Sequence, residues 1–256
     1  MLYPSLNLQS PVLDPNLSRG LVGYWPLDDQ GGIAYDRSGS GNHGTLVGDT
    51  KSVISERGRV MSFDGAGDYV DIGGSTVIGT GDYSISLWAR YNPPGTYHAL
   101  FGVYADAATA GTIIFGDSAG LQFRISSGVG GSVNCNFGDK DDNQWHHFVA
   151  SADRDGNGST YTDGILVDSQ NISSQSAYSL LISAMFIGIR WAAGGWDFNG
   201  SIDEVMIFNR ALSLSEAKQL HLYGMFKRRD PIELWTAATS GTIIPLIQYY
   251  NQQARA

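Results

Sequence analysis

The feature that most constrains the fold is a series of short strand patterns that runs along most of the chain and ends in one helix. The patterns are rich in β-branched and aromatic residues, and clusters of Gly, Asp, Asn and Ser separate them. Because helices do not alternate with these strands, the sequence predicts an all-β, two-sheet antiparallel jelly-roll sandwich. The predicted strands span residues 21–27, 45–47, 60–63, 69–72, 83–91, 98–104, 112–115, 121–125, 133–137, 145–152, 160–162, 165–168, 185–189 and 202–208.

Two stretches carry the pattern most clearly. Apolar residues alternate with Ser, Trp and Arg over residues 83–91, which is typical of a strand with one buried face. In residues 199–224 a strand is followed by a short helix. Ser213 and Glu216 have the spacing of a capping box at the start of that helix, and Gly224 predicts its end.

The composition agrees with a turn-rich β protein. The 256 residues include 33 Gly, 13 Tyr and 6 Trp but only four Glu, whereas helical proteins of this size use more Glu, Lys and Leu. A net charge of -9 argues against a nucleic-acid partner, since affinity for phosphates is built from Lys and Arg. The single cysteine, Cys135, cannot close an internal disulfide and is expected to pack as a small apolar residue.

The chain divides into three predicted parts. An extended arm (1–19) with three prolines precedes a domain (20–224), and an apolar arm (225–256) follows it. The first residues lack the basic and apolar regions of a secretory signal, so none is predicted. No segment reaches the ~18 consecutive apolar residues that a membrane span needs.

Several separated motifs give the domain a family resemblance. Their order and spacing resemble the laminin-G-like jelly rolls of the concanavalin A-like lectin and glucanase superfamily. This resemblance implies the same sandwich fold, in a family that includes carbohydrate binders and adhesion modules. The motifs are GLVGYWPLDD (20–29), DRSGSGNHGTL (36–46), SFDGAGDYVDI (62–72), YSISLWAR (83–90), WHHFVAS (145–151), DGILVDS (163–169) and GSIDEVMIFNRALS (200–213).

The candidate catalytic motifs are weak, and we expect no enzyme activity. Related glucanases carry E-x-D-x-x-E on one strand, whereas no glutamate of this chain has a second one within five residues. GDSAG (116–120) matches the G-x-S-x-G pattern, but the strands predicted on both sides indicate a hairpin rather than a nucleophile elbow. His146 and His147 lie in one strand beside Trp145, which favours a packing role.

The family resemblance also implies a structural calcium ion. Some relatives hold calcium between the first loop and an aspartate of the last strand, which corresponds here to Asp203 with Asp28, Asp36 and Asn42. DRDGNG (153–158) resembles the start of an EF-hand loop, but its twelfth position is Gly164, so a hairpin turn is predicted.

A ligand face is predicted in RWAAGGWDFNG (190–200), a loop between two strands. Trp191 and Trp196 offer rings on which a sugar can stack, and Asp197, Asn199 and Arg190 offer groups for its hydroxyls. The alternative is that these rings plug the end of the sandwich.

Both arms are too apolar for free solution, so we expect them to dock on this domain or on another protein. A basic cluster (227–229) precedes the apolar part of the C-terminal arm, and such tails after a laminin-G-like domain resemble those of phage-encoded proteins. The resemblance implies a non-catalytic virion structural protein that decorates a capsid or fibre at the virion surface. The alternative is a lectin-like carbohydrate-binding module or adhesin, extracellular or at the cell surface. The assembly residues are Tyr3, Leu6, Trp235, Ile244, Leu246, Tyr249 and Tyr250.

Overall fold

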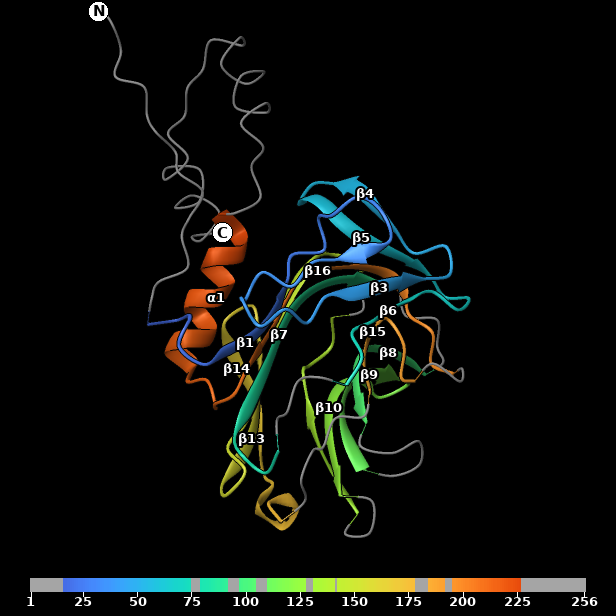
Figure 1. The fold of residues 1–256 in the computed structure, drawn as a ribbon. Coiled ribbons are helices and arrows are strands. Elements are labelled where there is room, and N and C mark those ends of the chain that lie inside the picture. The colour runs from blue at the N-terminus through green and yellow to red at the C-terminus, as the bar shows by residue number, and fades with distance from the viewer. Residues whose placement is uncertain are drawn as a thin grey trace, which may run out of the picture.

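Two antiparallel sheets pack face to face and enclose the main core, as the strand pattern predicts (Figure 1). The computed structural model describes residues 16–74, 79–91, 97–104, 110–127, 131–140, 142–177, 184–191 and 195–226. All strand pairs within the sheets are antiparallel, which confirms the predicted fold class.

Sheet A contains the longest strands and sheet B forms the opposite layer. In spatial order, sheet A consists of β14 (Ile165–Asn171), β13 (Asn157–Thr162), β12 (His146–Ala152), β7 (Tyr83–Tyr91), β16 (Asn199–Phe208), β5 (Gly58–Asp64) and β4 (Lys51–Ser55), with β1 (Leu21–Trp25) also paired to β16. Sheet B consists of β11 (Ser132–Asn136), β10 (Gly120–Ser127), β9 (Ala110–Asp117), β8 (His98–Tyr104), β15 (Ala184–Ile187), β6 (Tyr69–Asp71), β3 (Gly44–Val47) and β2 (Ile33–Ala34).

Strand β10 shows how alternation builds the two faces of sheet B. Leu121, Phe123 and Ile125 point inward to the core, so Gln122 and Arg124 point to the outer face. On β11, Cys135 is buried in the same core, which confirms its predicted packing role. Burial raises the pKa of its thiol to about 11.

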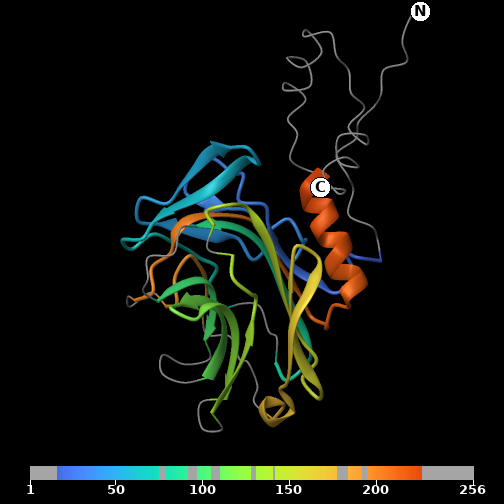
Figure 2. The same ribbon diagram turned by 180° about the vertical axis from the view of Figure 1, so that it is seen from behind.

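The outer face of sheet A is covered by the helix α1 (Leu214–Phe226). Ala217 and Leu220 of α1 pack against Val149, Met206 and Phe208, whose side chains leave sheet A on the side away from the core. Figure 2 shows α1 on one side of the sandwich, with the strands of sheet B on the other.

The helix changes the environment of strand β7. Its alternating sequence predicts one exposed face, yet nearly every residue from Tyr83 to Tyr91 is buried. That prediction was wrong because α1 and the segment before it cover the second face. The polar residues of that face are satisfied there: Ser84 Oγ donates to the Arg210 carbonyl, and Ser86 bonds His147.

The predicted capping box is confirmed, but the predicted helix end is wrong. Ser213 and Glu216 exchange hydrogen bonds, in which Glu216 N donates to Ser213 Oγ and Ser213 N donates to Glu216 Oε2. The helix continues through Gly224 to Phe226. A Cβ at Gly224 would lie 2.2 Å from Trp88 Nε1, so this glycine serves the close approach of the helix to sheet A.

Other local elements agree with the sequence or add to it. Residues 153–156 form the turn between β12 and β13, as predicted, and the sequence did not indicate β2, β4 or the 3-10 turn Ser173–Gln175. Among the described residues, no helix is both long and apolar enough to cross a membrane.

Candidate functional site

An aromatic cluster with two arginines covers part of the outer face of sheet B. We use the term aromatic cluster for Tyr97, Phe115, Trp191 and Trp196. Tyr97 stacks on Trp196 with ring centroids 4.5 Å apart and planes 12° apart, and Phe115 lies 5.2 Å from Trp196. Tyr97 is the most solvent-accessible of the four, at 51% exposure. The cluster therefore presents one ring to solvent on a layer of packed rings.

Backbone contacts fix the loop that carries Trp191 and Trp196. The Ala99 N–H donates to the Trp196 carbonyl, and the Gly188 N–H donates to the Leu100 carbonyl, so β8 holds both ends of the loop. A Cβ at Gly102 would lie 2.7 Å from the Arg190 carbonyl oxygen, which explains the glycine beneath this loop. The cluster is thus preorganised by the sheet.

Arginine side chains contact three of the four rings. The Arg190 guanidinium carbon lies 4.0 Å from the Trp191 ring centre and 4.2 Å from that of Trp196. On β10, Arg124 lies 4.3 Å over Phe115. All three contacts have cation–π geometry.

A chain of polar side chains crosses the same face beside the cluster. Arg124 Nε donates to Asn134 Oδ1 at 2.9 Å, and Asn134 Nδ2 donates to Gln122 Oε1 at 2.7 Å. Gln122 Nε2 then donates to Asp117 Oδ1 at 3.1 Å. We call these four residues the polar relay. Because Arg can only donate and a carboxylate can only accept, the relay sets the orientation of both amides.

Asp197 and Asn199, which were predicted to bind the ligand beside Trp191 and Trp196, contact a different loop. The Asp197 carboxylate accepts a hydrogen bond from the Gly67 N–H at 3.0 Å, in the turn after β5. Asn199 is exposed, pairs with Asp64 in the sheet register and lies against Gly65. The structure therefore gathers Trp191, Trp196 and Arg190 in one cluster and directs Asp197 to the β5–β6 turn.

Asp203, the aspartate predicted to bind calcium, is paired with a buried arginine. Its Oδ2 accepts from Arg57 Nε at 2.7 Å, and the exposed fractions of the two side chains are 6% and 0%. Burial lowers the pKa of Arg57, and the Asp203 carboxylate opposes that shift. The Arg57 guanidinium also lies 3.8 Å over the Trp88 ring, beneath α1.

The other predicted calcium residues lie in the first long loop. Asp36 accepts hydrogen bonds from the backbone N–H groups of Tyr24, Ser38 and Asn42. Burial acts to raise the pKa of Asp36, but the hydrogen bonds led by those of Ser38 lower it. Asp28 pairs with Arg37 at 3.1 Å. The described residues contain no group of three His, Cys, Asp or Glu arranged to hold a metal, and calcium stays a prediction.

His147 of β12 has the predicted packing role, whereas its neighbour His146 pairs with Asp163 and Asp142 at 2.6 and 3.2 Å. His147 is buried beneath α1, where its Nε2 lies 2.8 Å from Ser86 Oγ and its ring lies 5.1 Å from Trp88. Burial, together with His221 and Arg57, holds the pKa of His147 well below its usual value. The space around Ser86 and His147 admits no water molecule, so this pair is closed to a substrate.

The three described glutamates are each committed to a structural contact. Glu204 accepts from the Tyr24 hydroxyl at 2.8 Å, Glu56 pairs with Arg90, and Glu216 caps α1. Burial, and then the Glu204 carboxylate, raise the pKa of Tyr24. None of these contacts sets two carboxyl groups across a sugar bond.

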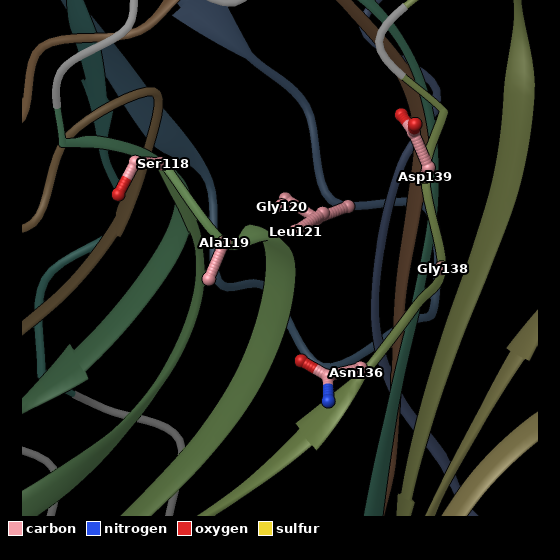
Figure 3. Close-up of a pocket in the computed structure, with 7 residues that line it drawn as sticks. All are labelled: Ser118, Ala119, Gly120, Leu121, Asn136, Gly138 and Asp139. Atoms are coloured by element: carbon pink, nitrogen blue, oxygen red, sulfur yellow. The ribbon is translucent and has the colours of Figure 1, made fainter.

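The GDSAG motif forms the turn between β9 and β10, which confirms the predicted hairpin. A cavity of about 260 Å³ lies there, lined by Ser118, Ala119, Gly120, Leu121, Asn136, Gly138 and Asp139. Figure 3 shows Ser118 and Asp139 on opposite sides of it. The lining includes no histidine that can act as a base for Ser118.

Six residues of the site escaped the sequence analysis: Tyr97, Phe115, Asp117, Gln122, Arg124 and Asn134. Tyr97 precedes β8 and reaches Trp196 only through folding. For Arg124 and Gln122 a signal existed, since alternation along residues 121–125 places them on the face opposite the core. The predicted assembly residues of the two arms lie outside the described residues.

Comparison with known proteins agrees with this architecture. The family model of the concanavalin A-like lectin/glucanases superfamily matches residues 64–218, which is more than half of the chain. No curated protein sequence matches the chain.

Several solved structures share the fold at low sequence identity. The binding domain of Paraclostridial Mosquitocidal Protein 1 has a TM-score of 0.67 at 16% identity, over 80% of this chain and 52% of that chain. Domain 4 of AbnA, a GH43 extracellular arabinanase from Geobacillus stearothermophilus solved with arabinotriose, has a TM-score of 0.63 at 19% identity, over 78% of this chain and 98% of that chain. The binding domain of botulinum neurotoxin DC, solved with SialylT, has a TM-score of 0.66 at 14% identity, over 81% of this chain and 52% of that chain.

The share of each neighbour that this chain covers shows how its size compares with theirs. The chain spans about half the length of the two toxin binding domains and nearly all of the arabinanase domain. With the two-sheet sandwich and the family match, these findings show that the chain belongs to the concanavalin A-like lectin/glucanase superfamily.

Proposed function

We propose that this chain is a non-catalytic carbohydrate-binding module whose ligand surface is the aromatic cluster and the polar relay on sheet B. The observation that carries the proposal is the half-exposed Tyr97 ring, stacked on Trp196, with the partly exposed Arg124 and Asn134 side chains on the same face of sheet B. Gln122 is buried and orients Asn134. This combination supplies a flat apolar platform and directional polar groups on one face.

The chemistry of a sugar fits such a surface. A pyranose ring has an apolar face that stacks on an aromatic ring, and hydroxyls at its edge that exchange hydrogen bonds with amides and guanidinium groups. Tyr97 is held by packing and the amides by the relay, so binding freezes few side-chain rotamers.

Two of the structural neighbours support the choice of ligand class. The arabinanase domain was solved with arabinotriose, and the neurotoxin binding domain with SialylT. At this low identity the likeness shows the fold alone, so the ligand class rests on the surface described above.

A pair of tyrosine variants tests the proposal. We expect the full-length protein to bind at least one saccharide on a glycan array, and Tyr97→Ala to weaken that binding by about tenfold or more because it removes the platform. Tyr35→Ala is the matched control, since Tyr35 is an exposed tyrosine at 44% that packs on His43 in the first loop. The affinities are measured by isothermal titration with the best array ligand. Absence of any array binding, or equal affinities of the two variants, would overturn the proposal.

A virion structural role, with the arms as anchors, is a second proposal. It is supported by the apolar sequence of both arms and by where the domain begins and ends in space. Leu17, close to the first described residue, is buried in the same apolar cluster as Leu220 of α1, the last described element, so the described chain begins and ends on the outer side of sheet A. If the arms anchor the protein on that side, the proposed sugar surface on sheet B faces away from the anchor.

Deletion of residues 227–256 tests this second proposal. Light scattering should show that the full-length chain self-associates, or binds a particle, and that the shortened chain does not. Equal association of the two proteins would contradict it.

A structural calcium ion held by Asp203, Asp28, Asp36 and Asn42 also remains a proposal. It is supported by the place of Asp36 and Asn42 in one loop, where the Asn42 N–H donates to Asp36 Oδ2. A melting temperature that a chelator leaves unchanged would contradict it.

A further inference from the structure

We infer that the saccharide of the sheet B surface is acidic, and that Arg124 receives its carboxylate while the sugar ring stacks on Tyr97. This inference rests on the proposed function and narrows its ligand to sugars that carry a carboxylate, such as uronic or sialic acids. Arg124, rather than a metal or a backbone amide, would be the residue that selects the ligand.

The position of Arg124 leaves its carboxylate-binding edge available. Its guanidinium carbon lies 4.3 Å from the Phe115 ring centre, and among the described residues its hydrogen bond runs from Nε to Asn134. The terminal nitrogens of a guanidinium lie in one plane and form two parallel hydrogen bonds with a carboxylate. Among the described residues, no Asp or Glu forms an ion pair with Arg124.

The polar relay holds this arginine in place before any ligand arrives. Asn134 is oriented by Gln122, and Gln122 is oriented by the Asp117 carboxylate. Because each amide donates in one direction along the chain, the oxygen of Asn134 must face Arg124. The guanidinium is therefore preorganised from both sides, by the relay and by the Phe115 ring.

A second positive charge lies on the same aromatic cluster. Arg190 contacts Trp191 and Trp196, and Trp196 in turn touches Phe115 beneath Arg124. The carboxylates of the neighbouring turns accept hydrogen bonds within the protein: Asp117 from the Ala119 N–H and Gln122, and Asp197 from the Gly67 N–H. In a chain with a net charge of -9, two arginines on one surface favour an anion at that place.

Two matched pairs of saccharides test the inference on the full-length protein. The pairs are 3′-sialyllactose with its methyl ester, and trigalacturonate with its methyl ester, so the members of each pair differ only in whether the carboxylate is free and charged. We expect isothermal titration to show at least tenfold tighter binding of one acidic member over its neutral partner, as a charge-assisted hydrogen bond contributes. That preference should shrink as salt is raised.

Variants at Arg124 test whether this residue causes the preference for the acidic sugar. Arg124→Gln should remove the preference for the acidic sugar, and it should weaken binding of the neutral partner by a much smaller factor than binding of the acidic sugar. Arg124→Lys keeps the charge without the fork, and it should retain part of the preference. Arg59→Gln is the matched control, since Arg59 is an exposed arginine on β5 of sheet A and should not alter either affinity.

The outcomes separate this inference from the proposed function. Neutral members that bind as tightly as acidic ones in both pairs, with Tyr97→Ala still weakening binding, would overturn the inference alone. A sulfated sugar that binds while neither carboxylated sugar does would also overturn it. If the full-length protein without substitutions binds no saccharide at all, the proposed function itself is overturned.

Discussion

The two outer faces of the sandwich carry the same pair of side chains in opposite settings. On sheet A, Arg57 lies 3.8 Å over Trp88 and binds Asp203, and α1 seals all three from water. On sheet B, Arg124 and Arg190 lie over aromatic rings, and no helix of the described residues covers them.

The two faces differ in which group pairs with the arginine. Beneath α1 the protein supplies the carboxylate, because a buried guanidinium without one is unstable. On sheet B the surface is solvated. There Arg124 forms no ion pair with an Asp or Glu of the described residues, and a ligand carboxylate could form one. An arginine stacked on a ring is therefore a structural element on sheet A and, in the proposed function, a binding element on sheet B.

The largest expected effect comes from removing the carboxylate beneath α1. Asp203→Asn leaves Arg57 charged and buried without its partner, and it should destabilise the fold by about 3–5 kcal/mol in chemical denaturation. Glu56→Gln, which breaks the surface pair with Arg90, is the control and should cost under about 1 kcal/mol. Equal losses for the two variants would remove the contrast between buried and exposed arginines.

The second-largest effect is expected from acid, which should lower the free energy of unfolding through the histidines beneath α1. Burial lowers the pKa of His147 and of His221, so both resist protonation when folded, and their stability contribution is lost as the pH falls below about 6.5. Burial opposes protonation of His146 too, but Asp163 and Asp142 raise its pKa, so its contribution is instead lost as the pH rises. Below that point His146 is protonated in both states, so the unfolded chain holds up to two more protons than the folded chain, on His147 and His221. This excess predicts a loss of up to about 2.7 kcal/mol per pH unit.

Chemical denaturation at pH 7.5, 6.5 and 5.5 measures this slope. His147→Gln retains a polar group near Ser86 and should flatten the profile, because it removes one of the two histidines that resist protonation. A wild-type stability that does not fall between pH 6.5 and 5.5 would contradict this prediction.

Loosening the helix should have a smaller effect. Ser213→Ala removes the side-chain cap of α1 and is expected to cost about 1 kcal/mol in thermal or chemical unfolding. Ser213→Asp keeps a capping oxygen and should restore most of the loss. If Ser213→Ala is neutral, packing on sheet A alone fixes the start of the helix.

The smallest effect on stability is expected at the sheet B surface. Arg124→Gln removes one cation–π contact and one hydrogen bond on a solvated face, and it should cost under about 1 kcal/mol of unfolding free energy. Thermal unfolding checks this value on the protein used for the binding experiments. A loss as large as that of Asp203→Asn would mean that Arg124 is also a structural element.

Local patterns determined the elements of the fold. The alternation of residues 83–91 and 98–104 yields two strands with the predicted bounds, and Ser213 with Glu216 forms the predicted cap of α1. These features were readable because strand alternation and capping act between residues close in sequence.

What covers each strand face was decided only by the tertiary structure. Trp88 and Ser86 look exposed in sequence but lie beneath α1, and Gly224 looks like a helix end but allows the approach of Trp88. The partner of Asp203 is Arg57, 146 positions away, which no local pattern indicates.

For the same reason, the sequence predicted only part of the candidate site. Trp191 and Trp196 stand out in one loop, so the sequence by itself pointed to a ring-bearing surface. Tyr97 and Arg124 join them from other strands, and the relay from Asp117 to Arg124 exists only because β9, β10 and β11 lie side by side. Sequence therefore determines which side chains a strand presents to each face, whereas sheet order and the covering helix decide which of them meet.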